Sequence, residues 1–286
     1  MELPTYTYDL MTSEERDIVS KDFTHPVVIR GFYKPKAIKV GFEGVTKMFG
    51  DADIPVELYN TADTSTSFGP DGFDDMSIPD LLKYWKKDRL PSIYCAEVDL
   101  YDLEDNVLWD NNCLLDRTLQ NPNLESRKAL SLLLYLGNNH ASGLHLHVSH
   151  DYILNQLYGS KTVYIFDNYE NPNIRKNRFF QVNKSNFADD NFFKMDHSKM
   201  KVYKVLLQPG DSLLIPPWYW HATQGHGINT SITQTFTRKD RSYLLKNPNL
   251  IFDYFIDDYR DTLPYLFIVI VIIIVLYVYM KRRALR

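Results

Sequence analysis

The chain has 286 residues, 44% of them hydrophobic and 14% aromatic, which predicts a folded body with a full core rather than a disordered chain. The formal charge is −4, but four of the 32 cationic residues lie among the last six, which leaves 28 Lys and Arg against 36 Asp and Glu elsewhere. An acidic body argues against nucleic acid as a partner, and two cysteines (Cys95 and Cys113) exclude a disulfide framework.

The first 90 residues predict a mixture of helices and strands. The pattern Thr12-Ser-Glu-Glu15 is typical of a capping box, which predicts a helix over residues 13–20. Residues 26–31 are typical of a short strand, and residues 61–75 of a polar loop. A second helix is expected to begin near Ser77 and to continue to Trp85. We expect this region, residues 1–90, to pack on the domain that follows.

Residues 91–240 alternate short β-prone runs with turn residues and predict a β-barrel domain. The expected strands cover residues 92–100, 129–136, 144–148, 152–158, 162–166, 202–207, 212–215 and 229–236. Strands at this spacing are typical of a sandwich or a barrel. Gly159-Ser160 matches a two-residue hairpin turn, and Pro209-Gly210 matches the centre of a type II turn.

The C-terminal part predicts a membrane anchor. Residues 241–262 are expected to form a helical stalk, and residues 263–280 (LPYLFIVIVIIIVLYVYM) carry no charge. A membrane-spanning helix needs about 17–25 apolar residues, and Lys281-Arg282-Arg283 follows directly. A buried core helix or strand is the alternative. The positive-inside rule alone would place the C-terminus in the cytosol. Because no N-terminal signal is present, we expect instead a single-pass, tail-anchored protein with a cytosolic body.

Four of the eight histidines fall between positions 140 and 150. Two of them, His145 and His147, lie in a strand-like run in which alternate side chains point to the same face. Both rings could therefore share one metal ion inside a barrel. A third histidine, His221, follows Pro-Pro-Trp-Tyr-Trp far along the chain, and closure of the barrel could bring it to the pair.

Several segments resemble the JmjC-type, cupin-like hydroxylases. The run from Leu134 to His147 is similar to the first metal-binding strand of that family, and the run from Gly159 through Lys161 to Phe166 is similar to its Gly-x-Lys strand. The run from Leu207 to His221 resembles the family's Pro-Gly-Asp segment, and the run from His25 to Phe32 resembles its opening strand. The resemblance covers residues 22–240. It implies a mainly β fold, a double-stranded β-helix (jelly roll) with flanking N-terminal helices.

The resemblance also implies roles for single residues. It implies iron(II), or another divalent metal, at His145, His147 and His221, with 2-oxoglutarate as the cosubstrate. Ser142 and Lys161 match positions that hold the 2-oxoglutarate carboxylate, and Thr235 is assigned to the same group. For Lys161 alone, the alternative is a solvated residue after a hairpin turn. The side chains expected to line the site are those of Trp218, Trp220 and Tyr152.

His147 departs from the family pattern, which has Asp or Glu at this position. Two histidines and one carboxylate leave three coordination positions open, whereas three neutral imidazoles leave the metal with more positive charge. Asp151 is a nearby carboxylate, but it lies beyond the expected spacing. We do not expect His140, His150 or His226 to be ligands. His150 has the wrong strand parity, and His226 is expected in a solvated loop between two glycines.

Three functions are compatible with these patterns. The first is a membrane-anchored dioxygenase that uses iron(II) and 2-oxoglutarate to hydroxylate a protein or small-molecule acceptor. The second is a three-histidine cupin dioxygenase that does not use 2-oxoglutarate. The third is a catalytically inactive module of the same fold that displays a binding surface on a membrane. The acidic body favours a basic partner over nucleic acid.

Overall fold

The computed structural model describes residues 2–15, 25–32, 53–60, 70–87, 92–99, 127–148, 150–167, 176–178, 181–185, 192–198 and 200–238. The expected stalk (residues 241–262) and membrane-spanning segment (residues 263–280) lie outside these ranges. Within the described ranges, no helix combines the length and the apolar character needed to cross a bilayer.

Strands make up most of the described chain, as the sequence predicts. The N-terminal elements are β1 (Thr5–Thr7), the 3-10 helix η1 (Tyr8–Leu10), β2 (Val27–Arg30), β3 (Asp53–Tyr59), β4 (Gly72–Ser77), α3 (Ile78–Trp85) and β5 (Ser92–Asp99). The elements that follow are β6 (Arg127–Asn138), β7 (Ala141–His145), β8 (His150–Asp167), β9 (Lys176–Arg178), β10 (Gln181–Ser185), the 3-10 helix η5 (Phe192–Lys194), β11 (Val202–Leu207), β12 (Ser212–Ile215) and β13 (Tyr219–Arg238).

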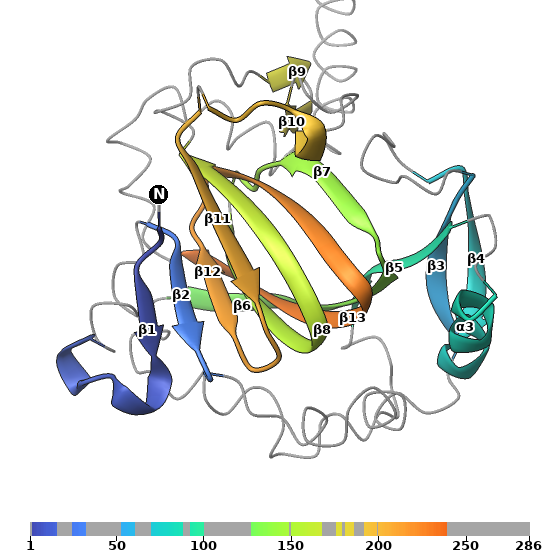
Figure 1. Ribbon diagram of the computed structural model, residues 1–286, viewed down its shortest axis with the longest axis horizontal. Coiled ribbons are helices and arrows are strands. Elements are labelled where there is room, and N and C mark those ends of the chain that lie inside the picture. Colours follow the sequence, from blue (N-terminus) through green and yellow to red (C-terminus); the bar gives the residue numbers. More distant parts are fainter. Residues whose placement is uncertain are drawn as a thin grey trace, which may run out of the picture.

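Two long antiparallel strands, β8 and β13, form the centre of a 13-stranded sheet (Figure 1). The first half of β8 pairs with β12 and its second half pairs with β11. The start of β13 pairs with β7 and the rest of it pairs with β6. Each long strand therefore belongs to two halves of the sheet. One half includes β2, β12, β6 and β5, and the other includes β11, β7 and β10.

Glycines mark the corner at which β8 and β13 pass from one half to the other. Gly159 has a φ of +66°, and a Cβ atom there would lie 2.3 Å from the carbonyl oxygen of Ile228. A Cβ atom on Gly225 would lie 2.1 Å from Nδ2 of Asn229. The expected hairpin turn at Gly159-Ser160 is wrong, because β8 continues through both residues. Positive φ bends the strand at a close approach to β13 and does not reverse it.

The two halves of the sheet face each other across an interior. Leu154 in the first half of β8 packs in one apolar cluster with Val163 and Ile165 in its second half. Elsewhere in the interior, Lys161 of the second half donates a hydrogen bond of 2.6 Å to Ser231, which lies in the part of β13 that pairs with β6. The sheet therefore folds back on itself and encloses both apolar and polar side chains.

Apolar layers cover the outer faces of the sheet. Helix α3 contributes Ile78, Leu81 and Trp85 to a cluster that includes alternate residues of β6, such as Leu134. Burying side chains of this size contributes about 1.5–3 kcal/mol each. On the other half, η5 packs Phe192 into a cluster with aromatic and aliphatic side chains of β7, β8 and β13. These layers bury the outer faces of the strands that carry the histidines.

Two local signals near the N-terminus are confirmed and one is wrong. Thr12 and Glu15 form the expected reciprocal capping box, with bonds of 2.8 and 3.1 Å. Ser77 caps α3 by accepting from the N–H of Asp80 at 3.3 Å. The loop expected at residues 61–75 is wrong at its end, because β4 begins at Gly72. Pairing with β3 holds this polar segment as a strand, although its composition does not favour one.

The turn between β11 and β12 is the type II turn that the sequence predicts. The N–H of Asp211 donates to the carbonyl oxygen of Gln208 at 2.9 Å, and Gly210 has a φ of +95°. Glycine is needed at this third turn position because positive φ is strained for other residues. The turn starts β12, the strand that precedes the Pro-Pro-Trp-Tyr-Trp-His segment.

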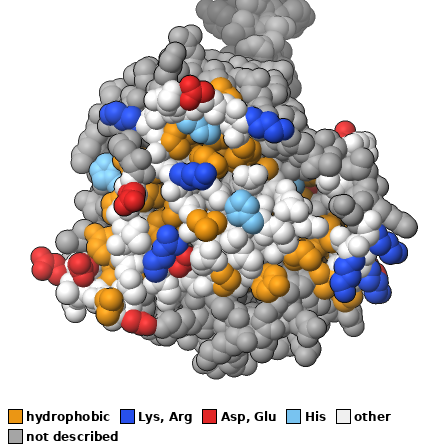
Figure 2. All heavy atoms as spheres, in the orientation of Figure 1, with side chains coloured by type: hydrophobic (Ala, Val, Ile, Leu, Met, Phe, Trp, Pro, Cys, Tyr) orange, Lys and Arg blue, Asp and Glu red, His pale blue; other side chains and the backbone are white. Residues whose placement is uncertain are grey.

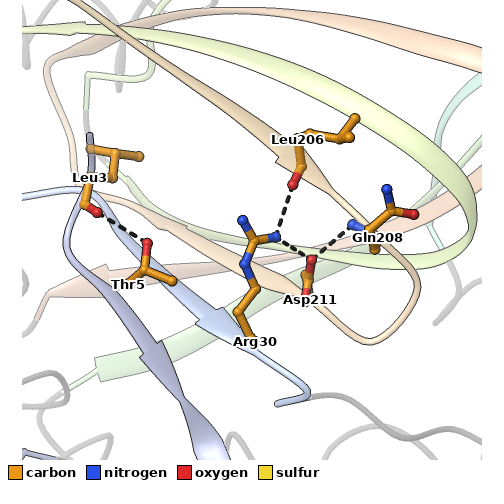
Figure 3. A network of polar contacts seen from close by, with 6 residues as sticks. All are labelled: Leu3, Thr5, Arg30, Leu206, Gln208 and Asp211. Carbon is orange, nitrogen blue, oxygen red and sulfur yellow. Dashed lines mark hydrogen bonds and ion pairs between the residues drawn. The ribbon is translucent and has the colours of Figure 1, made fainter. Parts of the chain in front are cut away.

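An ion pair from β2 fixes this turn (Figure 3). Arg30 donates to the carboxylate of Asp211 and, at 2.8 Å, to the carbonyl oxygen of Leu206. The same carboxylate accepts from the N–H of Gln208 at 2.8 Å. Because β2 also pairs with β12, the N-terminal region supports the strand through both backbone and side-chain bonds.

Candidate metal centre

Three histidine rings meet at the C-terminal end of β7 and the start of β13. The ring centroids of His145 and His221 are 4.2 Å apart, and the ring of His147 lies 5.2 Å from the first and 5.0 Å from the second. One nitrogen from each ring lies within 4.8 Å of the others. The geometry therefore brings together the three residues that the sequence analysis singled out as metal ligands.

Backbone pairing places two of these residues and a single hydrogen bond places the third. His145 and His221 are register partners in the antiparallel pair of β7 and β13. The strand expected over residues 144–148 ends at His145, so alternation along a strand does not explain the position of His147. The carbonyl oxygen of His147 instead accepts from the N–H of Trp218 at 2.9 Å. This bond ties the segment after β7 to the segment before His221.

Hydrogen bonds to backbone carbonyls orient two of the rings. Nδ1 of His145 lies 2.8 Å from the carbonyl oxygen of Gly143, and Nδ1 of His221 lies 3.1 Å from that of Tyr219. A carbonyl oxygen can only accept, so the Nδ1 atom of each ring carries the proton. The lone pair of Nε2 is then free to coordinate a metal, as in many metal-binding histidines.

Burial favours the neutral form of two of the three rings. It lowers the pKa of His221 well below the usual value, and the neighbouring His145 ring lowers this pKa further. Burial also lowers the pKa of His147, with smaller effects from the charges of His221, His145 and His150. Neutral imidazoles are the form that binds metal ions.

The donor set fits a divalent transition metal. Three imidazole nitrogens suit zinc, iron, nickel or copper, and they do not suit the hard cations that prefer oxygen ligands. Among the described residues, the cluster contains no carboxylate, and Asp151, although fully buried, is not part of it. The three-histidine cluster therefore indicates a site for a divalent metal ion without fixing which metal binds.

A buried lysine lies in the same interior. Lys161 is 4% exposed, donates to Ser231, and its Nζ lies 5.8 Å from the centroid of the Tyr135 ring. The alternative of a solvated residue after a hairpin turn is therefore wrong, because β8 carries the side chain inward. Burial lowers the pKa of Lys161 to about 8. No carboxylate in the described part of the chain pairs with this ammonium group, which leaves it able to bind an anion.

Several hydroxyl groups of the sheet form hydrogen bonds with one another. Ser142 hydrogen-bonds with the phenol of Tyr94, and Tyr135 hydrogen-bonds with Thr233. Thr235 lies farther along β13, where its hydroxyl accepts from the N–H of Ser131 at 3.1 Å. Sequence patterns pointed to Ser142 and Thr235 but not to the two tyrosines and Ser231. A usable signal was present in β13, where residues 231, 233 and 235 are all Ser or Thr and share one face.

The residues expected to line the site lie in two different environments. Tyr152 stacks on the ring of His147, with centroids 3.6 Å apart and planes at 21°. Trp218 and Trp220 are buried in the apolar cluster that contains Leu144 and Phe166. Trp218 has a φ of +74°, a strained conformation that turns the chain just before β13. The two tryptophans thus support the histidine-bearing segments by packing.

The remaining histidines near the site are not part of the cluster. His140 is buried and stacks on Tyr94, with ring centroids 3.5 Å apart. His150 is the first residue of β8. His226 is exposed as expected, but the loop predicted around it is wrong. It lies within β13, and its Nε2 is 2.7 Å from the hydroxyl of Thr162.

A comparison with known families matches the model of the cupin-like domain over residues 12–242. The chain belongs to the cupin-like domain family. No curated protein matches the chain. The match spans the strands from β2 to β13, and it includes all three clustered histidines and Lys161. This cupin-like domain therefore combines a mainly β fold with a candidate site for a divalent metal.

Proposed function

We propose that this cupin-like protein is an iron(II)- and 2-oxoglutarate-dependent oxygenase that hydroxylates a protein or another acceptor. The observation that carries the proposal is Lys161, a buried cation with no carboxylate partner among the described residues, in the interior that also holds three clustered histidines. A buried ammonium group of this kind is costly unless an anion joins it. A dicarboxylate that also binds the metal would remove this cost.

The spacing along β8 supports a dicarboxylate bridge. Ile165 is the register partner of His221, and Lys161 lies four residues away on the same strand. At ~3.3 Å per residue this is a separation of about 13 Å, which a lysine side chain and a five-carbon dicarboxylate can span together. Alternate residues share a face, so Lys161 and Ile165 point to the same interior.

In this proposal each residue has a defined task. His145, His147 and His221 hold the metal through neutral imidazole nitrogens. Lys161 holds the distal carboxylate of 2-oxoglutarate, and the Ser142 hydroxyl adds a hydrogen bond to it. Thr235 is a further candidate for this group. Iron(II) and 2-oxoglutarate, when bound, supply the power to activate dioxygen, and the chain supplies orientation and a dry environment.

The replacement of a carboxylate by His147 favours one alternative. A site with three neutral ligands keeps the full charge of the metal, which changes its redox balance. A three-histidine cupin dioxygenase that does not use 2-oxoglutarate is therefore the second candidate. In that case Lys161 would bind a carboxylate of the substrate itself. A catalytically inactive module is the third candidate. The strained backbone of Trp218 and the buried tryptophan side chains beside the histidines argue against it, because strain is kept mainly at functional sites.

We also propose that residues 263–280 anchor the protein in a membrane, with the body in the cytosol. Eighteen uncharged residues followed by Lys281, Arg282 and Arg283 support this assignment. The acceptor would then be a protein or another molecule that reaches the membrane surface.

Release of succinate from 2-oxoglutarate, without added acceptor, tests the proposed activity. The purified full-length chain, loaded with iron(II) under anaerobic conditions and then exposed to air, is expected to release succinate. Lys161→Met and His221→Ala should abolish the release. His226→Ala, which removes an exposed histidine of the same strand, should not change it. Firm metal binding without 2-oxoglutarate binding would support the second candidate instead.

A further inference from the structure

Strands β3, β4 and β5 extend the sheet beyond β6, and the two faces of this extension differ. Side chains alternate along β3, so Ile54 and Val56 are buried under α3 whereas Asp53 and Glu57 point to the opposite face. We name this opposite face the acidic face. Its defining residues are Asp53, Glu57, Tyr59, Phe73, Asp75 and Tyr94.

A row of side chains on the acidic face runs from the surface to the site. Phe73 is the register partner of Glu57, which in turn is the register partner of Tyr94. Phe73 is 74% exposed, Glu57 is half-buried and Tyr94 is 6% exposed. Direct partners have Cβ atoms about 4.5–5.5 Å apart, so the row is continuous. Its buried end reaches Ser142, which lies on the same strand as His145.

The charges on this face have one sign. Asp53 and Asp75 are exposed, and Glu57 is joined by Glu97, which lies close enough to raise its pKa. Burial makes the larger contribution to this rise, and a hydrogen bond from Tyr59 opposes it. The described part of the acidic face carries no lysine or arginine. The cations of this region gather instead over α3, on the opposite side (Figure 2).

A stack of rings at the buried end carries an unused hydrogen-bond acceptor. His140 is 9% exposed, stacks on Tyr94, and lies 5.3 Å from the ring of Tyr59. Burial lowers the pKa of His140 to about 3, with a smaller effect from Lys161, so the ring is neutral. Its nitrogens have no hydrogen-bond partner among the described residues. A neutral imidazole beside two phenol rings suits an N–H donor with positive charge.

We propose that the acidic face binds a basic, extended segment of a protein substrate and leads it toward the metal centre. A lysine or arginine side chain of that segment lies between Glu57 and the stack of His140, Tyr59 and Tyr94. Phe73 covers apolar parts of the segment at the edge. The proposal rests on the proposed function, because it names the substrate class of that site. The acidic carboxylates attract the segment, and the half-buried Glu57 gives specificity.

Binding of short labelled peptides to the full-length chain tests this proposal. One peptide alternates lysine with serine and the other alternates glutamate with serine, and fluorescence anisotropy measures their affinity. We expect only the basic peptide to bind, and its affinity should fall with added salt. Glu57→Gln should weaken it about tenfold, and Asp75→Asn about twofold to threefold.

The matched control is Asp74→Asn. Asp74 and Asp75 are neighbours on β4, both are exposed, and they point to opposite faces of the extension. Either substitution removes the same charge from the chain, so a general attraction to the acidic body would weaken equally in both. Equal losses for Asp74→Asn and Asp75→Asn would overturn the proposal, as would equal binding of the two peptides. Phe73→Ser and Asp75→Asn alter exposed side chains, so they keep the test valid if Glu57→Gln does not fold.

The peptide assay separates this proposal from the proposed function. Binding is measured without metal or 2-oxoglutarate, and succinate release is measured without peptide. Succinate release without selective peptide binding would overturn the substrate proposal alone. Selective peptide binding without succinate release would overturn the oxygenase proposal while the acidic face retained its ligand.

Discussion

Burial leaves the lysine and the histidines of the interior in different charge states at neutral pH. The low dielectric disfavours the charged form of both side chains, so the histidines stay neutral and become good metal ligands. Lys161 still carries its charge near neutral pH because its pKa is lowered only to about 8. A neutral donor set and a cation thus share one interior, and each needs a different ligand.

The affinity for 2-oxoglutarate is expected to depend on the charge of Lys161. Below a pH of about 8 the ammonium form predominates and attracts the carboxylate, and above it the charge is lost. Affinity should therefore be highest at neutral pH and fall as the pH rises through about 8. Titration calorimetry on the metal-loaded chain checks this. Lys161→Met should cost about 2 kcal/mol or more, about thirtyfold or more in affinity, and remove the pH dependence. Unchanged affinity across this range would contradict the role of Lys161.

The identity of residue 147 is expected to set the rate of 2-oxoglutarate turnover. His147→Asp supplies the carboxylate that the JmjC-type hydroxylases resembled by the sequence have at this position, and lowers the charge left on the metal. Succinate release should then increase while the metal stays bound, and a succinate assay with parallel metal analysis measures both. An unchanged or lower rate with full metal content would show that the imidazole does not weaken this chemistry.

At the scale of whole elements, the corner between the sheet halves is expected to be the most sensitive part of the backbone. Gly159→Ala places a Cβ atom against the backbone of Ile228 at positive φ, and should cost about 3 kcal/mol or more. Gly227 also has positive φ, at +63°, but its Cβ would have no atom within 4 Å. Gly227→Ala should therefore cost only about 1–2 kcal/mol. Denaturant midpoints of the two variants test this, and equal losses would contradict the close approach.

The same corner shows what sequence patterns can and cannot predict. The short β-prone runs separated by turn residues predicted the strands well, because alternation and turn residues are local signals. Gly159-Ser160 looked like a hairpin turn and Gly225-His226-Gly227 like a loop, yet both lie within long strands. Glycine marks positive φ or a close approach, and only the tertiary structure decides whether the chain bends or reverses.

The candidate site was predictable where residue types are distinctive. Two histidines in an HxH pattern and a third in a distant segment are rare enough to attract attention, and they converge. Tyr94, Tyr135 and Ser231 were missed, because single hydroxyl-bearing residues on strands have many ordinary roles. Their relation to Lys161 depends on sheet register and on the folding back of β8, which local patterns do not encode.

At the scale of the whole molecule, the apolar segment at residues 263–280 is expected to hold the protein in a membrane. The full-length chain should stay with membranes after alkaline extraction, because a spanning helix is not released by changes in charge. A protease added to intact vesicles should remove an N-terminal tag, since we place the body on the cytosolic side. Protection of that tag would contradict the proposed orientation, and release by alkali would contradict the anchor.

The metal content of the full-length chain tests the central claim most directly. After anaerobic loading with iron(II) and removal of free metal, elemental analysis should find about one ion per chain, because a single three-histidine cluster is present among the described residues. His221→Ala should lose the ion, and His226→Ala should retain it. A chain that binds no metal, or equal metal content in wild type and His221→Ala, would contradict a centre built from His145, His147 and His221.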